Sequence, residues 1–422
     1  MNPRSFFAGL FVAALLVVAV RPALAQTVDV SAMSEDQLRA HATAIHARVL
    51  TLDTHDDIES NFATAEVDPG VRGPRQVDLP KMRDGKLDVG TFIVYVGQTE
   101  RTPANYDKAK ADAMTKFDAI HRMAEQMYPA EIEIAYTADD VERIHKSGKL
   151  VAVIAIENGY VIGQDLSLVE KYQQLGARYM TLTHNGHNDI GDSANPRANL
   201  GDDGDEHSGL SAFGEEVVRE MNRVGIMVDI SHTSKKSSLH AARVSRAPII
   251  ASHSSVKALC NVPRNMDDET MLALKATGGV MNIVALDSFL KQDSPEKTRA
   301  IDDLRAEYGL TGFGGLQGLS DEQRAGYRQK LAAVEKQHPG PTMQDFVDHI
   351  DYAVKLIGID HVGISSDFDG GGGITGWLDA SETPNVTLEL VRRGYSEEAI
   401  GKLWSGNLLR VWREVERVAG EM

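Results

Sequence analysis

The chain has 422 residues, of which 42% are hydrophobic, and it carries a formal net charge of −17. This acidity disfavours nucleic acid and anionic membrane surfaces as partners. The length would allow two or three domains, although α/β barrels of this size commonly form one. The single cysteine, Cys260, excludes an internal disulfide and a cysteine-rich zinc site.

The N-terminus has the layout of a secretory signal peptide. Arg4 precedes an apolar run from Phe6 to Val20, and the small residues Ala23 and Ala25 follow it. We expect cleavage after about Ala25, which would export the protein to the periplasm or outside a bacterial cell. An uncleaved anchor is the weaker interpretation, because the run is short for a membrane span. No later segment is apolar enough to cross a membrane.

Short apolar or β-branched runs then alternate with helix-like stretches. Run length and β-branched content predict eight strands. They cover residues 48–53, 89–97, 150–157, 178–184, 225–232, 247–253, 278–285 and 361–369. Near-continuous apolar strands separated by helices indicate a parallel sheet covered by helices. Eight such units favour a (β/α)8 barrel of the TIM type with extra helices, formed by residues 26–422 as a single domain.

Helix end signals support this alternation. One helix-like stretch opens with Ser211 as an N-cap and ends near Gly225. A doubly wound open sheet is the alternative fold, but no G-x-G-x-x-G pattern follows the first strand. Two segments interrupt the alternation, a Gly/Asp/Asn-rich loop at 185–209 and a charged insertion at 287–342. Long loops after barrel strands often shape substrate access.

Metal-binding side chains follow six of the predicted strands. The carboxyl ends of barrel strands converge on one face, and that face carries active sites. Imidazole and carboxylate groups suit Zn²⁺, so their convergence favours a metal site. In chain order these residues are His55, Asp57, Glu157, His184, His232, His253, Asp367 and Asp369.

The first pair, His55 and Asp57, illustrates the argument. Residues two apart in an extended segment point the same way, so both can face the interior while Asp56 faces away. A solvated acidic turn would explain the same residues equally well. Glu157 ends a long apolar run, and burying such a carboxylate without a partner is costly. A lone strand-end histidine is more often structural, but His232 and His253 in consecutive units are harder to dismiss.

The number of candidate ligands allows one metal ion or two. Three such groups would fill one zinc site with a position left open, whereas five with Glu157 shared would fill two. Two metals about 3.5–4 Å apart can bind a bridging hydroxide and polarise a carbonyl. The residues alone therefore indicate a metallohydrolase on a barrel. Other histidines fall mainly in helix-like or charged stretches and are expected at the surface, namely His41, His46, His121, His145, His240, His338 and His349.

Ordered sequence blocks resemble the renal (membrane) dipeptidase family of zinc peptidases. They are "DTHDD", "GARYMTLTHN", "GLSAFGEEVVREMNRVGIMVDISHTS", "APIIASHSSVKALCNVPRNMDDE" and "HVGISSDFDG". The resemblance extends from about Val49 to Leu409, and blocks of this length and order are specific. Thr54 and Asp56 depart from the usual Gly and Asn beside the first histidine. "ENGY" likewise replaces a Glu-Gly-Gly-His pattern.

This resemblance implies a role for each candidate residue. His55 and Asp57 would bind one Zn²⁺, His232 and His253 a second, and Glu157 would bridge both. His184 would contact the substrate and help to stabilise the tetrahedral intermediate. Arg264 would hold the C-terminal carboxylate of a dipeptide, and Asp367, near its amino group, would shuttle protons. The family also implies a possible homodimer.

Three further interpretations stay open. The first is a related binuclear metallohydrolase of another small amide, lactam or ester. The second is a non-catalytic exported binding protein, which would require the metal ligands to be incidental. The third is a glycosidase that uses Glu157 and Asp367, but it leaves the histidines unexplained.

Overall fold

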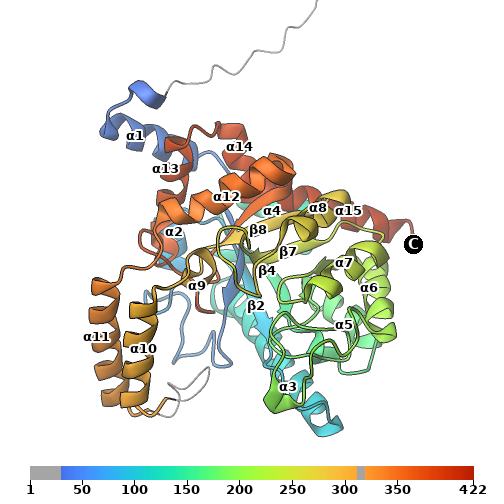
Figure 1. Cartoon of the computed structure of the whole chain (residues 1–422). Coiled ribbons are helices and arrows are strands. Elements are labelled where there is room, and N and C mark those ends of the chain that lie inside the picture. The colour runs from blue at the N-terminus through green and yellow to red at the C-terminus, as the bar shows by residue number, and fades with distance from the viewer. Residues whose placement is uncertain (1–29, 311–318) are drawn as a thin grey trace, which may run out of the picture.

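The computed structural model describes residues 30–310 and 319–422, and the predicted signal peptide at 1–25 lies outside them. Eight parallel strands follow one another in the order β1-β2-β4-β5-β6-β7-β8-β9. Their bounds are β1 Leu52–Asp57, β2 Val89–Tyr95, β4 Leu150–Glu157, β5 Ala177–Thr181, β6 Met227–Asp229, β7 Ile250–Ser254, β8 Val280–Val284 and β9 Val362–Ser365. Where the ends of this sheet meet, the Asp57 N–H donates to the Phe368 carbonyl at 2.8 Å. The predicted (β/α)8 barrel is therefore confirmed (Figure 1).

Two strand predictions need correction. β1 begins at Leu52 and continues through Asp57, whereas the sequence suggested residues 48–53, so the acidic stretch is strand and not turn. A short strand that was not predicted, β3 (Ile132–Ile134), pairs with Leu150–Ala152 at the start of β4. Three residues are too few to show a periodicity, and β3 exists because β4 offers it a free edge.

Helices cover the outside of the barrel, as the alternation predicted. Ser211 caps α6 by accepting from the Gly214 N–H at 2.9 Å, and Gly225 ends that helix with a φ of 82°. The helices are α1 Glu35–His46, α2 Leu79–Asp84, α3 Pro103–His121, α4 Ala138–Lys146, α5 Ser167–Gln174, α6 Ala212–Val224, α7 Lys235–Val244, α8 Asp268–Ala276, α12 Met343–Ile357, α13 Pro384–Arg392, α14 Glu397–Gly401 and α15 Asn407–Gly420. In the described ranges, none has the length and hydropathy needed to cross a bilayer.

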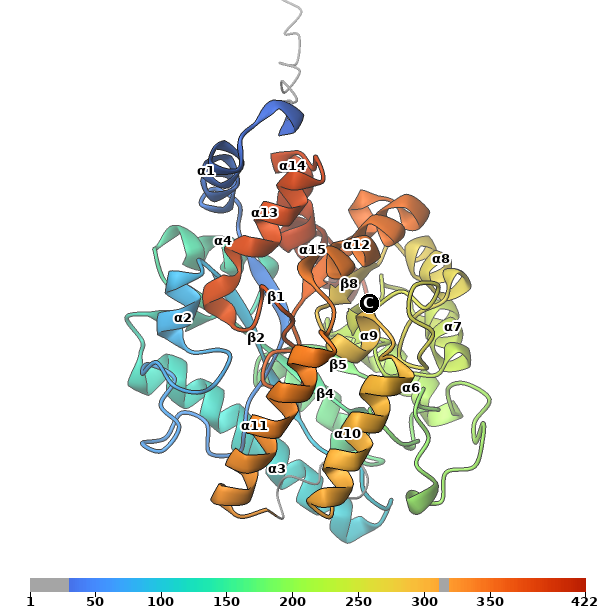
Figure 2. The same cartoon turned by 60° about the vertical axis from the view of Figure 1, so that its left-hand side comes forward.

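The charged insertion between β8 and β9 is largely helical. It contains α9 (Asp287–Leu290), α10 (Pro295–Glu307) and α11 (Asp321–Gln337). The last two lie side by side (Figure 2), and Figure 1 shows this hairpin standing out from the barrel. A small apolar cluster, which includes Leu304 and Tyr327, holds the pair together.

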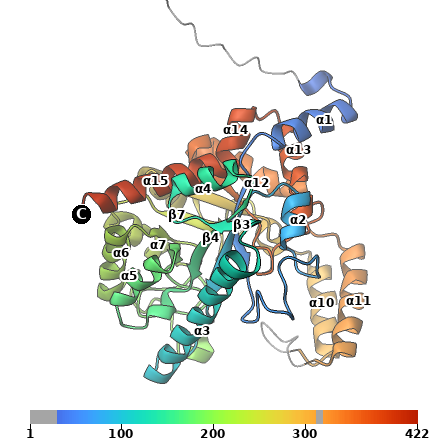
Figure 3. The ribbon, with the colours of Figure 1, turned by 180° about the vertical axis from the view of Figure 1, so that it is seen from behind.

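Alternate residues of the strands build two separate cores. In β4, Val151, Val153 and Ala155 belong to an interior cluster, while the residues between them pack under the surrounding helices. Trp412 of α15 is fully buried in the interior cluster. Figure 3 shows α15 and α4 at one end of the strands, with α3 extending past the other end. Apolar packing therefore closes one end of the barrel and leaves the carboxyl ends of the strands available for polar side chains.

Two histidines expected at the surface are buried. His46 contacts the Thr387 hydroxyl and the Gly85 carbonyl through its two ring nitrogens. His349 accepts from the Val256 N–H at 3.0 Å and contacts the Leu290 carbonyl. Both rings join distant segments of backbone, which a helical sequence pattern cannot reveal.

Replacing Trp412 with alanine should lower the free energy of unfolding by about 3–5 kcal/mol, because it removes a large ring from the closed end of the barrel. Denaturant unfolding followed by circular dichroism measures this change. Leu378→Ala is the control, since that side chain is 57% exposed and its loss should change stability by less than about 0.5 kcal/mol. Equal stability of the two variants would contradict the role assigned to α15.

Candidate metal centre

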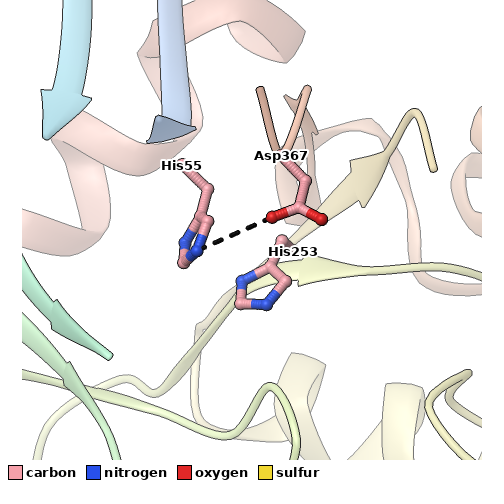
Figure 4. A group of neighbouring side chains, drawn as sticks. All are labelled: His55, His253 and Asp367. Carbon is pink, nitrogen blue, oxygen red and sulfur yellow. Dashed lines mark ion pairs between the residues drawn. The ribbon is translucent and has the colours of Figure 1, made fainter. Parts of the chain in front are cut away.

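The predicted site residues come together at the carboxyl ends of the strands. Glu157 is the last residue of β4, and His253 lies in β7. His184 and His232 come shortly after β5 and β6. Figure 4 shows His55, His253 and Asp367 pointing toward one another, although they come from three different strand ends. The convergence inferred from the sequence is therefore present.

A single oxygen atom of Glu157 lies at the middle of the cluster. Its Oε1 is 2.9 Å from His232 Nε2 and 3.3 Å from His253 Nε2. The same atom is 3.6 Å from His55 Nε2 and 3.9 Å from His184 Nε2. Four imidazoles thus surround one carboxylate that is only 4% exposed.

A second set of contacts surrounds His55. Its Nε2 lies 3.5 Å from Asp57 Oδ2 and 3.8 Å from Asp367 Oδ1, the latter drawn as the dashed line in Figure 4. The ligand atoms of His55, Asp57 and Glu157 all lie within 4.8 Å of one another. The same spacing holds for Glu157 with His184 and His232, and for His55 with His253 and Asp367. These overlapping groups offer more donors than one ion requires.

The charges in the cluster influence one another strongly. Burial alone would raise the pKa of Glu157, but the surrounding histidines hold it well below its usual range. Burial lowers the pKa of His232 and of His253 well below that of free imidazole. The carboxylate is therefore ionised and these two rings are neutral, which is the state in which each group binds a metal ion.

Neighbouring hydroxyls orient two of the rings. The Tyr179 hydroxyl donates to the Thr54 carbonyl at 2.8 Å, so it must accept from His55 Nδ1–H at 2.9 Å. The Ser252 hydroxyl donates to Asp229 at 2.6 Å and accepts from His253 Nδ1–H at 2.8 Å. In both rings the hydrogen-bond network places a proton on Nδ1, so the neutral ring has its lone pair on Nε2, which faces the cluster. Burial would lower the pKa of His55, but Tyr179, Glu157 and Asp57 hold it well above the usual range, so a metal ion would replace a proton on its Nε2.

The sequence did not identify these supporting residues. Asp229 is fully buried in β6, and it also accepts from the backbone N–H groups of Ser231 and Ser252. A carboxylate within an otherwise apolar predicted strand is a sequence signal that could have identified Asp229. Tyr179 and Ser252 carry no comparable signal, since their role depends on which side chains they contact across the barrel.

The acidic residues beside His55 are buried structural groups. Asp53 accepts from the backbone N–H of Ser366 at 2.9 Å and of His55 at 3.3 Å, so it joins β1 to the end of β9. Asp56 faces away from the cluster, as predicted, but it is 1% exposed and lies against Gly90 of β2. Burial and the nearby Asp53 raise the pKa of Asp56 well above its usual range.

The turn after β9 places Asp367 beside Asp57. Asp367 has a φ of 59°, and burial raises its pKa well above the usual range. A Cβ at Gly370 would come within 2.2 Å of Asp57 Oδ2 and 2.6 Å of Asp367 Oδ1, so only glycine fits there. Asp369 points elsewhere and accepts from Arg75 at 3.1 Å and from the Gln76 N–H at 3.0 Å. It anchors the turn and is not part of the cluster.

Arg264 is a buried cation near the histidines. Its guanidinium donates to the His253 carbonyl at 3.2 Å and lies 5.1 Å from the centre of the Phe289 ring. Within the described residues, no carboxylate lies within 4.0 Å of it. Burial lowers its pKa to about 10. A cavity of about 410 Å³ adjoins both Arg264 and His232.

The 185–209 loop forms part of the site. The Ser193 hydroxyl donates to the His184 carbonyl, and the Ala194 N–H donates to the His232 carbonyl at 2.7 Å. Both contacts hold the backbone of a candidate site residue. His187 accepts from the Ser193 N–H at 3.0 Å, and His207 contacts the Asn188 carbonyl, so these two histidines stabilise the loop.

The donor set fits metal ions. Nε2 of His55 is buried and makes no hydrogen bond, although three carboxylates lie within 3.8 Å of it. Leaving such an atom without a partner is costly unless a ligand satisfies it. Imidazole nitrogens with carboxylate oxygens, grouped around a shared glutamate, are the donors that Zn²⁺ and similar ions prefer.

Comparison with known proteins agrees with this site. The sequence profile of the family described as membrane dipeptidase (peptidase family M19) matches residues 39–422. The chain is 33% identical over 348 residues to dipeptidase tcpJ of Claviceps purpurea, covering 81% of this chain and 70% of that protein. It is 33% identical over 349 residues to dipeptidase aclJ of Aspergillus oryzae, covering 82% and 71%.

Among solved structures, the probable dipeptidase PvdM from Pseudomonas aeruginosa superimposes with a TM-score of 0.81. It is 34% identical to this chain, and the match covers 92% of this chain and 100% of that one. The family profile, the named dipeptidases and the cluster of metal-binding side chains thus agree with one another. The chain therefore belongs to the membrane dipeptidase family and is a metal-dependent dipeptidase.

Proposed function

We propose that the protein is an exported dipeptidase that uses two zinc ions. The observation that carries this proposal is the position of Glu157, whose Oε1 has four imidazole Nε2 atoms within 3.9 Å. Glu157 and three of these imidazoles, together with Asp57, make five donors. One ion with an open position would take three of them, whereas two ions that share Glu157 would use all five.

The two halves of the cluster suggest how the ions divide the ligands. His55 and Asp57 would hold one ion, and their ligand atoms are 3.5 Å apart. His232 and His253 would hold the other, with Nε2 atoms 2.9 Å apart. Glu157 would bind both. When bound, a zinc pair supplies an activated water and polarises the scissile carbonyl.

Arg264 would select substrates by their free carboxyl terminus. A guanidinium binds a carboxylate through two parallel hydrogen bonds, and here it would do so in a buried setting. Nε of Arg264 is buried and has no hydrogen-bond partner in the described structure. The cavity beside it can receive the side chain of the second residue of a dipeptide.

Asp367 and His184 would act on the bound substrate. Burial raises the pKa of Asp367, which makes its ionised carboxylate a stronger base. In that ionised form Asp367 could accept a proton from the attacking water and then donate it to the leaving amine. Burial lowers the pKa of His184, whose neutral ring could donate a hydrogen bond to the developing oxyanion. Homodimerisation stays a prediction from the family resemblance.

Replacing Glu157 with glutamine should lower the zinc content from about two ions per chain and reduce kcat/KM for dipeptides by roughly 10³-fold or more, since metal catalysis contributes several kcal/mol. Elemental analysis and a dipeptide assay measure the two effects. Glu133→Gln is the matched control, because Glu133 is a partly exposed acid that pairs with Arg143 and Lys149. Full zinc content and full activity in Glu157→Gln would refute the shared ligand.

Replacing Arg264 with methionine should raise KM for dipeptides by about 10–100-fold, because a charge-assisted hydrogen bond to the substrate carboxylate is lost. Arg264→Lys should fall between this variant and the wild type, since it keeps the charge but not the fork of two donors. Steady-state kinetics on a dipeptide and on its C-terminal amide measure the change. If Arg264→Met raises KM for the dipeptide and for its C-terminal amide by the same factor, the proposed binding of the substrate carboxylate to Arg264 is wrong.

Export predicts that the mature protein begins at about Gln26. Expression of the full chain in a Gram-negative host, followed by N-terminal sequencing of the periplasmic fraction, tests this expectation. A variant with Asp at positions Leu15 and Leu16 should stay in the cytoplasm, because charges disrupt the apolar run that export requires. An uncleaved N-terminus in the wild type would favour a membrane anchor.

A further inference from the structure

A lysine that the proposed reaction does not use lies beside the candidate metal centre. Lys116 of α3 is only 8% exposed, and its Nζ is 5.4 Å from the centre of the Tyr95 ring. Tyr95 is the last residue of β2, and its ring centre lies 4.7 Å from that of His184. The same tyrosine ring therefore neighbours both the lysine and a residue that contacts the metal-binding cluster.

Lys116 has no ion-pair partner in the described parts of the chain, where no carboxylate comes within 4.0 Å of its Nζ. Lysine is rarely buried this deeply without a paired charge. Burial lowers its pKa, and the more distant Asp57 and Glu157 partly oppose that effect. Both of these acids are proposed metal ligands. Their charge would be engaged by the metal ions, so a charged Lys116 would have no compensating anion from these two residues.

A second cation, Arg197, lies on the 185–209 loop near the segment that follows His184. Asp202 Oδ2 accepts from the backbone N–H of Arg197 at 2.6 Å and from that of His187 at 2.9 Å, which holds Arg197 close to this segment. The Arg197 side chain is half-buried, and its guanidinium has no hydrogen bond or ion pair within residues 30–310 and 319–422. The positive charge of Arg197 affects the pKa values of two rings in this region, those of His184 and Tyr95. It adds to the effect of burial in lowering the pKa of His184, and it opposes the rise that burial causes in the pKa of Tyr95.

The strand order places these cations opposite Arg264. In the ring β1-β2-β4-β5-β6-β7-β8-β9, the strand four places from β2 in either direction is β7. Tyr95 ends β2, and Arg264 contacts the backbone of His253 in β7. If the substrate carboxylate lies on Arg264 and the peptide bond lies over the metal centre, the first residue of the substrate extends toward β2.

We propose that Lys116 and Arg197 form a cationic subsite for a carboxylate on the side chain of the substrate's first residue. The preferred substrates are then dipeptides that begin with an acidic residue. This inference rests on the proposed function, because the direction of the substrate comes from Arg264. It goes further, since neither the metal centre nor the carboxylate clamp selects the first side chain.

The test compares Glu-Ala with Gln-Ala, which differ in charge and hardly in shape. Each is prepared with L- and with D-alanine as the second residue. For the wild type we expect kcat/KM for Glu-Ala to exceed that for Gln-Ala by about tenfold, mainly through KM, because a charge-assisted hydrogen bond is gained. Lys116→Met and Arg197→Gln should each bring this ratio close to one.

Lys110→Met is the matched control. Lys110 lies on the same helix, is partly exposed and pairs with Asp107, so its loss should leave the Glu-Ala to Gln-Ala ratio at about tenfold. If Lys116→Met does not fold, Arg197→Gln decides the question, because Arg197 is a half-exposed loop residue.

Three results would contradict the inference, and they can be told apart. A wild-type ratio of one or less overturns the subsite while dipeptide hydrolysis stands. If Lys116→Met lowers kcat/KM for Glu-Ala and for Gln-Ala by the same factor, so that their ratio is kept, Lys116 only supports Tyr95. A wild type that hydrolyses no dipeptide overturns the proposed function, and the subsite with it.

Discussion

The structure depends on a single buried carboxylate. Glu157 is 4% exposed, and one of its oxygens contacts imidazoles that come from the ends of β1, β6 and β7 and from the segment after β5. Burying this charge in an apolar barrel would be costly without such partners. The barrel supplies them because parallel strands in a closed ring bring distant parts of the chain to one point. Apolar packing around Trp412 closes the opposite end, so stability and chemistry lie at different ends of the same strands.

Contacts around the cluster make its geometry specific. Tyr179 and the Asp229–Ser252 pair orient two rings, and Asp53 joins the first strand to the last. Gly370 leaves room for the carboxylates of Asp57 and Asp367, with which the Cβ of any larger residue would clash. Rigid support of this kind matters because metal affinity depends on the direction of each lone pair as much as on the identity of the ligand.

Charge also explains how the site could recognise both residues of a dipeptide substrate. Arg264 and Lys116 are each buried without a carboxylate partner among the described residues, and they lie on opposite sides of the metal-binding cluster. An unpaired buried cation is unfavourable in the free protein, and our proposals therefore assign an anionic group of the substrate to each position.

Periodicity and residue type by themselves determined the main outline of this protein. Alternating apolar runs predicted the barrel, and the spacing of His55 and Asp57 predicted their common direction, because side chains two apart in a strand face the same way. The tertiary structure decided the rest. It extended β1 through Asp57, added β3, and buried His46 and His349. It also paired His55 with Tyr179, 124 residues away, and placed Lys116 of α3 against the ring of Tyr95. Such contacts join positions far apart in the chain, so no local pattern records them, and only the closure of the barrel brings them together.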